Sequence, residues 1–142
     1  MAMTSPDAPT PPVRNWSESV VAYVPILESL DSVAGHEQIP ELSRWIFPGV
    51  PLVVSVHEIK GASPMRRHYC DEHSHGDEDE VLIALGVSDD FTLDLVIGSR
   101  RHQIGPKSAA FVPAGTTHST NVVVGTGFLV TLKSARRQGV SE

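Results

Sequence analysis

The chain has 142 residues, of which 40% are hydrophobic and 20% charged, so it is long enough for one domain with a real core. Its formal net charge of −6 argues against a nucleic-acid partner, which requires a basic face. No apolar run approaches the roughly 18 residues of a membrane span, and the N-terminus lacks a secretory-signal pattern. Cys70 is the single cysteine and cannot form an intrachain disulfide, so a cytoplasmic protein is expected.

The two ends of the chain differ in composition from the rest. Residues 1–15 are rich in Pro, Ser and Thr with few large apolar groups, which predicts a disordered tail. Residues 135–142 are similar and are expected to form a flexible C-terminal tail. This leaves 16–134 as a single predicted domain.

Short strands are predicted along most of that domain. Val20–Ile26 reads as a strand, and residues 28–46 are mixed, with a short helical segment that Pro40 limits in length. Further apolar runs, separated by Gly- and Pro-containing turns, predict strands at Leu52–Ile59, Val81–Leu85, Phe91–Ile97, Ala109–Val112 and Val122–Leu132. Strands of this length and spacing indicate an all-β sandwich or barrel.

The segment from His73 to Glu80 carries the first chemical signal. In a strand, side chains at i and i+2 share a face, so His73 and His75 would direct two imidazoles to one point. A turn at Gly76 would let the chain reverse and place the Glu80 carboxylate beside them. Imidazole and carboxylate together suit divalent iron, manganese, cobalt, nickel and zinc. Glu78 remains open as the alternative carboxylate.

A second segment lies farther along the chain. Pro113 and Gly115 predict a tight turn that delivers His118 at the start of a strand, as a third imidazole. Neither segment is specific alone, but the two in this order, separated by strand, turn and strand, form a stronger signal. Three histidines outside both segments are expected to be structural or exposed: His57, His68 and His102.

The two segments resemble the two sequence motifs of the cupin superfamily. The first motif runs Gly, five residues, His-x-His, three or four residues, Glu, six residues, Gly. The second runs Gly, five residues, Pro-x-Gly, two residues, His, three residues, Asn. The resemblance spans about Leu52 to Leu132 and matches all four proposed ligands. Four other positions, interpreted as turn positions, depart from the motifs: Arg67 in place of a glycine, and Gly86, Gly105 and Asn121 displaced by one or two residues.

This resemblance implies a cupin-type jelly-roll β-barrel that holds one divalent transition metal. The implied ligands are His73, His75, Glu80 and His118, with iron placed first and zinc, manganese, nickel or cobalt as alternatives. The implied function is a metal-dependent enzyme acting on a small oxygen-rich metabolite, commonly as a homodimer. A non-haem iron oxygenase is slightly favoured over a lyase, isomerase or cyclase that uses the metal as a Lewis acid. A small-molecule binding or sensing module with a structural metal is another alternative, and a metal-free cupin a further one.

Strand parity suggests two further site residues. If Arg67 to His75 forms one extended strand, Arg67 and Tyr69 share the face of His73 and His75. Tyr69 is then a candidate catalytic proton donor or acceptor, and Arg67 a candidate for binding a substrate carboxylate. A bulge or loop near Pro64 would break this parity.

Overall fold

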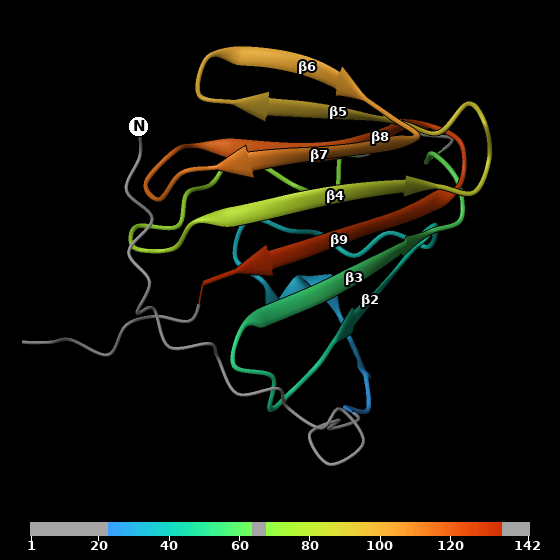
Figure 1. Ribbon diagram of the computed structural model, residues 1–142. Coiled ribbons are helices and arrows are strands. Elements are labelled where there is room, and N and C mark those ends of the chain that lie inside the picture. The colour runs from blue at the N-terminus through green and yellow to red at the C-terminus, as the bar shows by residue number, and fades with distance from the viewer. Residues whose placement is uncertain (1–22, 64–67, 135–142) are drawn as a thin grey trace, which may run out of the picture.

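The computed structural model describes residues 23–63 and 68–134, and this part of the chain is nearly all β (Figure 1). In chain order the elements are β1 (Ile26–Glu28), the 3-10 turn η1 (Leu30–Ser32), β2 (Leu42–Ile46), β3 (Val53–Ile59), β4 (Glu80–Gly86), β5 (Thr92–Ile97), β6 (Arg100–Ile104), β7 (Lys107–Val112), β8 (His118–Val124) and β9 (Gly127–Lys133). Within these two ranges, no helix has the length and apolar character needed to cross a membrane.

The strands form two antiparallel sheets that lie as two layers (Figure 1). The larger sheet has the order β1-β2-β3-β9-β4-β7, and the smaller one has the order β6-β5-β8. The last strand, β9, is inserted between β3 and β4, so strands that are distant in sequence become direct neighbours. The domain is therefore closed by non-local pairing rather than by hairpins alone.

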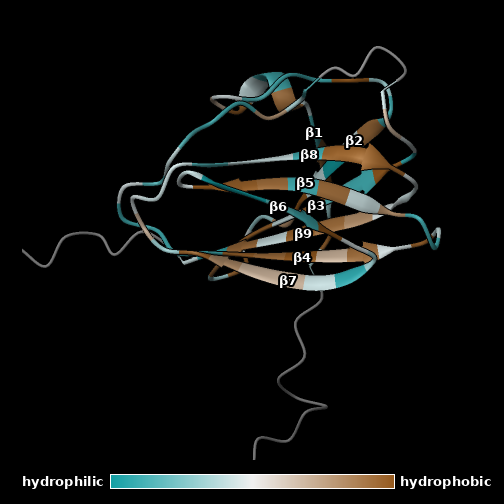
Figure 2. Ribbon diagram, turned by 90° about the horizontal axis from the view of Figure 1, so that it is seen from above, coloured by the Kyte–Doolittle hydropathy of each residue, from teal (hydrophilic) through white to brown (hydrophobic). Residues whose placement is uncertain are grey.

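The hydrophobic core fills the space between the two layers. Phe91, Leu93 and Leu95 are completely buried, whereas Thr92 and Asp94 between them are half-buried, so apolar and polar residues of this segment alternate between the core and the outer face. They belong to one cluster with buried side chains of the larger sheet, among them Leu82, Ala84, Val112 and Leu129. Figure 2 shows the contrast with β6, which is polar along most of its length and exposed.

The strands predicted over Leu52–Ile59, Val81–Leu85, Phe91–Ile97 and Ala109–Val112 are confirmed as β3, β4, β5 and β7. The expected helical segment is only the three-residue turn η1, where Ser29 caps the turn by accepting a hydrogen bond from the Asp31 amide. The rest of that region contains β2, which burial of alternate side chains stabilises as a strand. The first strand begins at Ile26, at the end of the range predicted for it, and residues 20–22 lie outside the described residues.

The long run predicted as Val122–Leu132 is two strands, β8 and β9, separated by a turn in which Gly125 has φ +87°. β8 begins at His118, as the turn at Pro113 and Gly115 predicted, and so includes four residues ahead of the apolar run at Val122. The polar sequence His-Ser-Thr-Asn does not look like a buried strand, yet all four residues are buried. β6 was not predicted, because an exposed polar edge strand lacks the apolar period of a half-buried one. The predicted tails, 1–15 and 135–142, lie outside the described residues.

Candidate metal centre

The backbone joins the two predicted segments directly. His73 and His118 form an isolated antiparallel bridge, with the His73 amide donating to the His118 carbonyl at 3.0 Å and the reverse bond at 2.8 Å. The Gly115 amide donates to the His75 carbonyl at 2.6 Å, from a turn in which Gly115 has φ +77°. The continuous strand expected up to His75 is not formed: in residues 68–75, only Cys70 and His73 make bridges.

The four predicted ligands lie together. The ring centroids of His73 and His118 are 4.4 Å apart, those of His73 and His75 5.0 Å, and those of His75 and His118 5.2 Å. One nitrogen from each of these three rings lies within 4.8 Å of the others. Glu80 Oε2 lies 2.9 Å from His118 Nε2 and 3.2 Å from His75 Nε2. The four residues are therefore neighbours, but a loop rather than a strand holds His73 and His75, so strand parity is not what brings them together.

Backbone carbonyls fix the tautomers of two of these imidazoles. His73 Nδ1 lies 2.8 Å from the Asp71 carbonyl, and His118 Nδ1 lies 2.9 Å from the Thr116 carbonyl. A carbonyl only accepts, so Nδ1 carries a proton in both rings, and Nε2 is the nitrogen that remains to bind a metal. This is the arrangement by which proteins orient metal-binding histidines.

The electrostatics of the cluster suit a cation. Burial lowers the pKa of His73, and lowers that of His75 to about 4, so both imidazoles are neutral near pH 7. Burial also opposes charge on Glu80 and His118, but their mutual contact outweighs it, lowering the pKa of Glu80 and raising that of His118. Glu80 Oε2 and His118 Nε2 are buried, with no hydrogen-bond partner outside the cluster among the described residues. The donor set therefore fits a divalent transition metal of the borderline class.

A small cavity of about 40 Å³ adjoins the cluster, with room for a few water molecules. Tyr69 lines it, completely buried, and its hydroxyl has no hydrogen-bond partner among the described residues. Burial raises the pKa of this phenol well above its ordinary value, so it stays protonated. Arg67, the candidate for substrate binding, lies outside the described residues.

His57 was expected to be structural or exposed; it is buried and it lines the cavity. Its ring meets that of Tyr69 edge-on, with centroids 5.8 Å apart. The alternation of β3 could have predicted that His57 is buried, because His57 shares a face of the strand with the buried Ser55 and Ile59. The expectation holds for His68 and His102, which are exposed.

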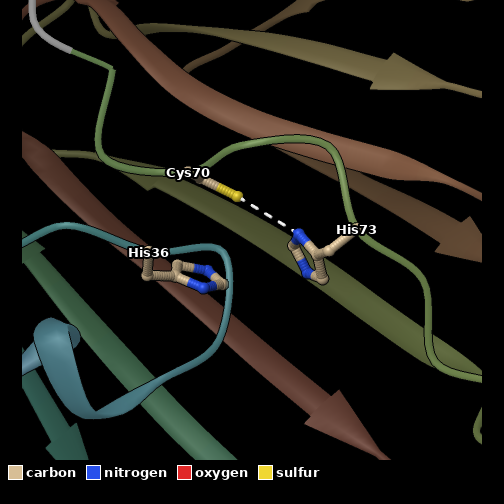
Figure 3. A group of neighbouring side chains, drawn as sticks. All are labelled: His36, Cys70 and His73. Carbon is tan, nitrogen blue, oxygen red and sulfur yellow. Dashed lines mark hydrogen bonds between the residues drawn. The ribbon is translucent and has the colours of Figure 1, made fainter.

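Three further residues beside the centre were not predicted as site residues: His36, Cys70 and Arg44. His36, Cys70 and His73 place one ligand atom each within 4.8 Å of the others, and Cys70 Sγ lies 3.7 Å from His73 Nδ1 (Figure 3). Burial raises the pKa of the Cys70 thiol to about 11, so it is a neutral thiol at pH 7. Arg44, buried on β2, lines the cavity as well. His36 and Arg44 lie in the region that was expected to contain a helical segment, so strand alternation could not predict which way their side chains point.

Asn121 departs from the motif spacing, and its role differs from the one expected. It lies within β8 rather than in a turn, and it is buried. Its Oδ1 accepts from the amides of Tyr69 and Cys70 at 2.9 and 3.1 Å, and its Nδ2 donates to the Cys70 carbonyl at 2.8 Å. A side chain on β8 thus positions the loop that presents Tyr69 to the cavity.

Comparisons with known proteins support the fold. No protein-family model matches the sequence, and no curated protein is significantly similar to it. Among solved structures, a predicted oxalate decarboxylase from Thermotoga maritima matches with a TM-score of 0.55 at 15% identity, over 79% of this chain and 92% of that one. KdgF from a Halomonas species matches at 0.51 and 17%, over 72% and 86%. A cupin 2 conserved barrel domain protein from Rhodopseudomonas palustris matches at 0.52 and 17%, over 82% and 74%. The two antiparallel sheets, the topology and these likenesses show that this chain has the cupin fold, a jelly-roll β-barrel.

Proposed function

We propose that this protein is a metal-dependent cupin enzyme that acts on a small, oxygen-rich organic metabolite. The observation that carries the proposal is the convergence of three imidazoles and one carboxylate in the lining of a small cavity. His73, His75, Glu80 and His118 would hold one divalent metal. When bound there, the metal would supply Lewis-acid activation of a carbonyl or carboxylate oxygen.

The chain's own residues favour proton-transfer chemistry, as in a lyase, isomerase or cyclase. Tyr69 offers a buried O–H that stays protonated at neutral pH and has no partner in the described structure, which is the state required of a proton donor. His57, its neighbour, is kept neutral because burial lowers its pKa to about 3. The narrow cavity limits the water that can compete with Tyr69 for the substrate. Tyr69 is therefore the candidate catalytic acid.

A non-haem iron oxygenase is the second candidate. The donor set favours it, since imidazole and carboxylate ligands suit iron, and four protein ligands leave two positions of an octahedral ion free. The likeness to a predicted oxalate decarboxylase suits either candidate, because both act on small oxygen-rich compounds. Iron is the first choice of metal for the oxygenase, and zinc, manganese, nickel or cobalt would serve proton-transfer chemistry.

Metal content of untagged protein tests the common part of the proposal. We expect about one metal per chain in the wild type and at least a tenfold loss of affinity in His75→Ala. His102→Ala is the matched control, because this histidine is exposed and distant from both motif segments, and it should keep the metal. Full occupancy in His75→Ala would refute the centre.

Two comparisons refine the assignment. If Glu80→Ala keeps its metal and Glu78→Ala loses it, the carboxylate ligand is Glu78. Oxygen consumption on turnover, with iron as the bound metal, would establish the oxygenase and reject the proton-transfer candidate. Turnover without oxygen that is lost in Tyr69→Phe, with metal content unchanged, would do the opposite.

A further inference from the structure

Two cationic side chains line the cavity beside the ligand cluster. Arg44 is buried on β2, with 7% of its surface exposed, and Lys133 lies at the end of β9, directly opposite Glu80 in the strand register. Glu80 is the only carboxylate among the described residues that line this cavity. Within the lining itself the two cations outnumber the one carboxylate, although Arg44 is also paired with Glu28 outside the lining, and a bound divalent metal would add further positive charge. A cavity of this sign attracts an anion.

Arg44 is held at one end of this cavity by its neighbours. Its Cα is paired with that of His57 on β3, so the two side chains leave the sheet on the same face. Its Nη1 forms an ion pair with Glu28 from β1. A guanidinium has five N–H donors in a planar fork, so this ion pair leaves donors over for a second oxyanion.

Two buried groups that line the same cavity as Arg44 lack partners among the described residues. The Tyr69 hydroxyl and His57 Nδ1 are both buried, and neither has a hydrogen-bond partner among the described residues. Each such group needs an explanation, because almost all buried polar atoms in proteins are hydrogen-bonded. Both can donate a hydrogen bond as neutral groups, so ligand oxygens would satisfy them.

We propose that Arg44, assisted by His57 and Tyr69, binds the carboxylate of a small hydroxy or oxo acid. The hydroxyl or oxo oxygen of that acid would face the ligand cluster. This deepens the proposed function, on which it rests, by naming the substrate class. The cavity size favours a ligand of only a few heavy atoms. Arg44 contributes a charge-assisted, two-pronged contact, and the two neutral donors orient the same carboxylate.

Glycolate and ethylene glycol are the probes for this site. They have nearly the same size, but only glycolate carries a carboxylate. Their binding is measured by calorimetry at constant ionic strength, both with metal-loaded and with chelator-treated protein. We expect glycolate to bind the wild type and ethylene glycol to bind at least tenfold more weakly. Equal binding of the two probes would overturn the proposal.

Two variants separate recognition of the anion from the structural ion pair. Arg44→Met and Glu28→Gln both remove the ion pair between β1 and β2. We expect Arg44→Met to weaken glycolate binding at least tenfold with metal content unchanged, and Glu28→Gln to bind glycolate as tightly as the wild type or more tightly, because it frees the guanidinium. Equal weakening in both variants, or wild-type binding in Arg44→Met, would overturn the proposal.

Two further outcomes are distinguishable. If Arg44→Met does not fold, Arg44→Lys is used instead, because lysine keeps the charge but lacks the planar fork of donors. We expect Arg44→Lys to bind glycolate at least fivefold more weakly than the wild type, and unchanged binding would overturn the proposal. Should the wild type hold no metal, the proposed function fails. Arg44-dependent glycolate binding by the metal-free protein would still support this site, and its absence would reject it.

Discussion

The titration of His57 makes the stability of the domain depend on pH. Burial lowers its pKa from 6.5 to about 3 in the folded state. Below pH 6.5 the unfolded chain binds a proton at this position and the folded chain does not, so stability is lost as pH falls from 6.5 towards 3. One pKa unit corresponds to about 1.4 kcal/mol, so this histidine alone costs about 0.8 kcal/mol by pH 6 and about 2 kcal/mol by pH 5.

Urea unfolding of chelator-treated protein measures this loss. The wild type and His57→Gln are compared at pH 7.5, 6 and 5, since glutamine keeps a hydrogen-bonding side chain but does not titrate. The difference at pH 7.5 reports the ordinary cost of the substitution, and only its change with pH reports the proton. We expect the wild type to lose about 2 kcal/mol more than His57→Gln between pH 7.5 and pH 5.

Parallel loss of stability in the two proteins would refute this reasoning. It would mean that His57 takes up a proton in the folded state, which requires either a water-filled route to the ring or an anion beside it. The loss shared by both proteins belongs to the other histidines. Burial also lowers the pKa values of His36, His73 and His75, so these contribute in the same direction.

Three other outcomes are expected. Metal affinity, measured by metal titration, should fall about tenfold per pH unit just below pH 6.5. His118 has a raised pKa and competes for a proton there, whereas burial lowers the pKa of His73 below 6.5 and that of His75 to about 4; a thousandfold fall per unit would contradict this. Asn121→Ala should lower the free energy of unfolding by about 3 kcal/mol, because it leaves the buried backbone groups of Tyr69 and Cys70 without hydrogen-bond partners. A loss below about 1 kcal/mol would show that water takes the place of the asparagine side chain. Gly105→Ala should cost about 3 kcal/mol or more in the same assay, because its Cβ would lie 2.0 Å from the Phe91 carbonyl oxygen, and a neutral effect would show that this backbone moves freely.

The sequence predicted those parts of the fold that have a clear period. In Phe91–Ile97 the apolar Phe91, Leu93 and Leu95 alternate with Thr92 and Asp94, and these three apolar residues are in the core. The ligand cluster was predictable for a similar reason, because the spacing within His73–Glu80 and the turn before His118 each fix a local direction. The likeness between the two segments and the cupin motifs then related regions that no local rule could bring together.

The rest depended on contacts between distant segments. β8 begins with a buried polar sequence, in which Asn121 is satisfied by three backbone groups on a loop about 50 residues away. Arg44 enters the cavity because β2 pairs with β3, and the sequence of β2 shows no strong preference for a strand. Residues whose environment is decided by such pairing cannot be placed by propensity or period.

The bridge between His73 and His118 has a consequence for the unfolded chain. It is a single pair of backbone hydrogen bonds joining positions about 45 residues apart. A cation bound by both His73 and His118 would cross-link the chain. If the cross-link persists in the unfolded chain, a loop of that size lowers its conformational entropy by an amount worth about 4 kcal/mol. The cross-linked loop contains the four strands β4 to β7, which belong to both sheets. Removal of the ion should therefore lower the melting temperature of the whole domain in one cooperative transition, rather than only loosening the loop around the ligands.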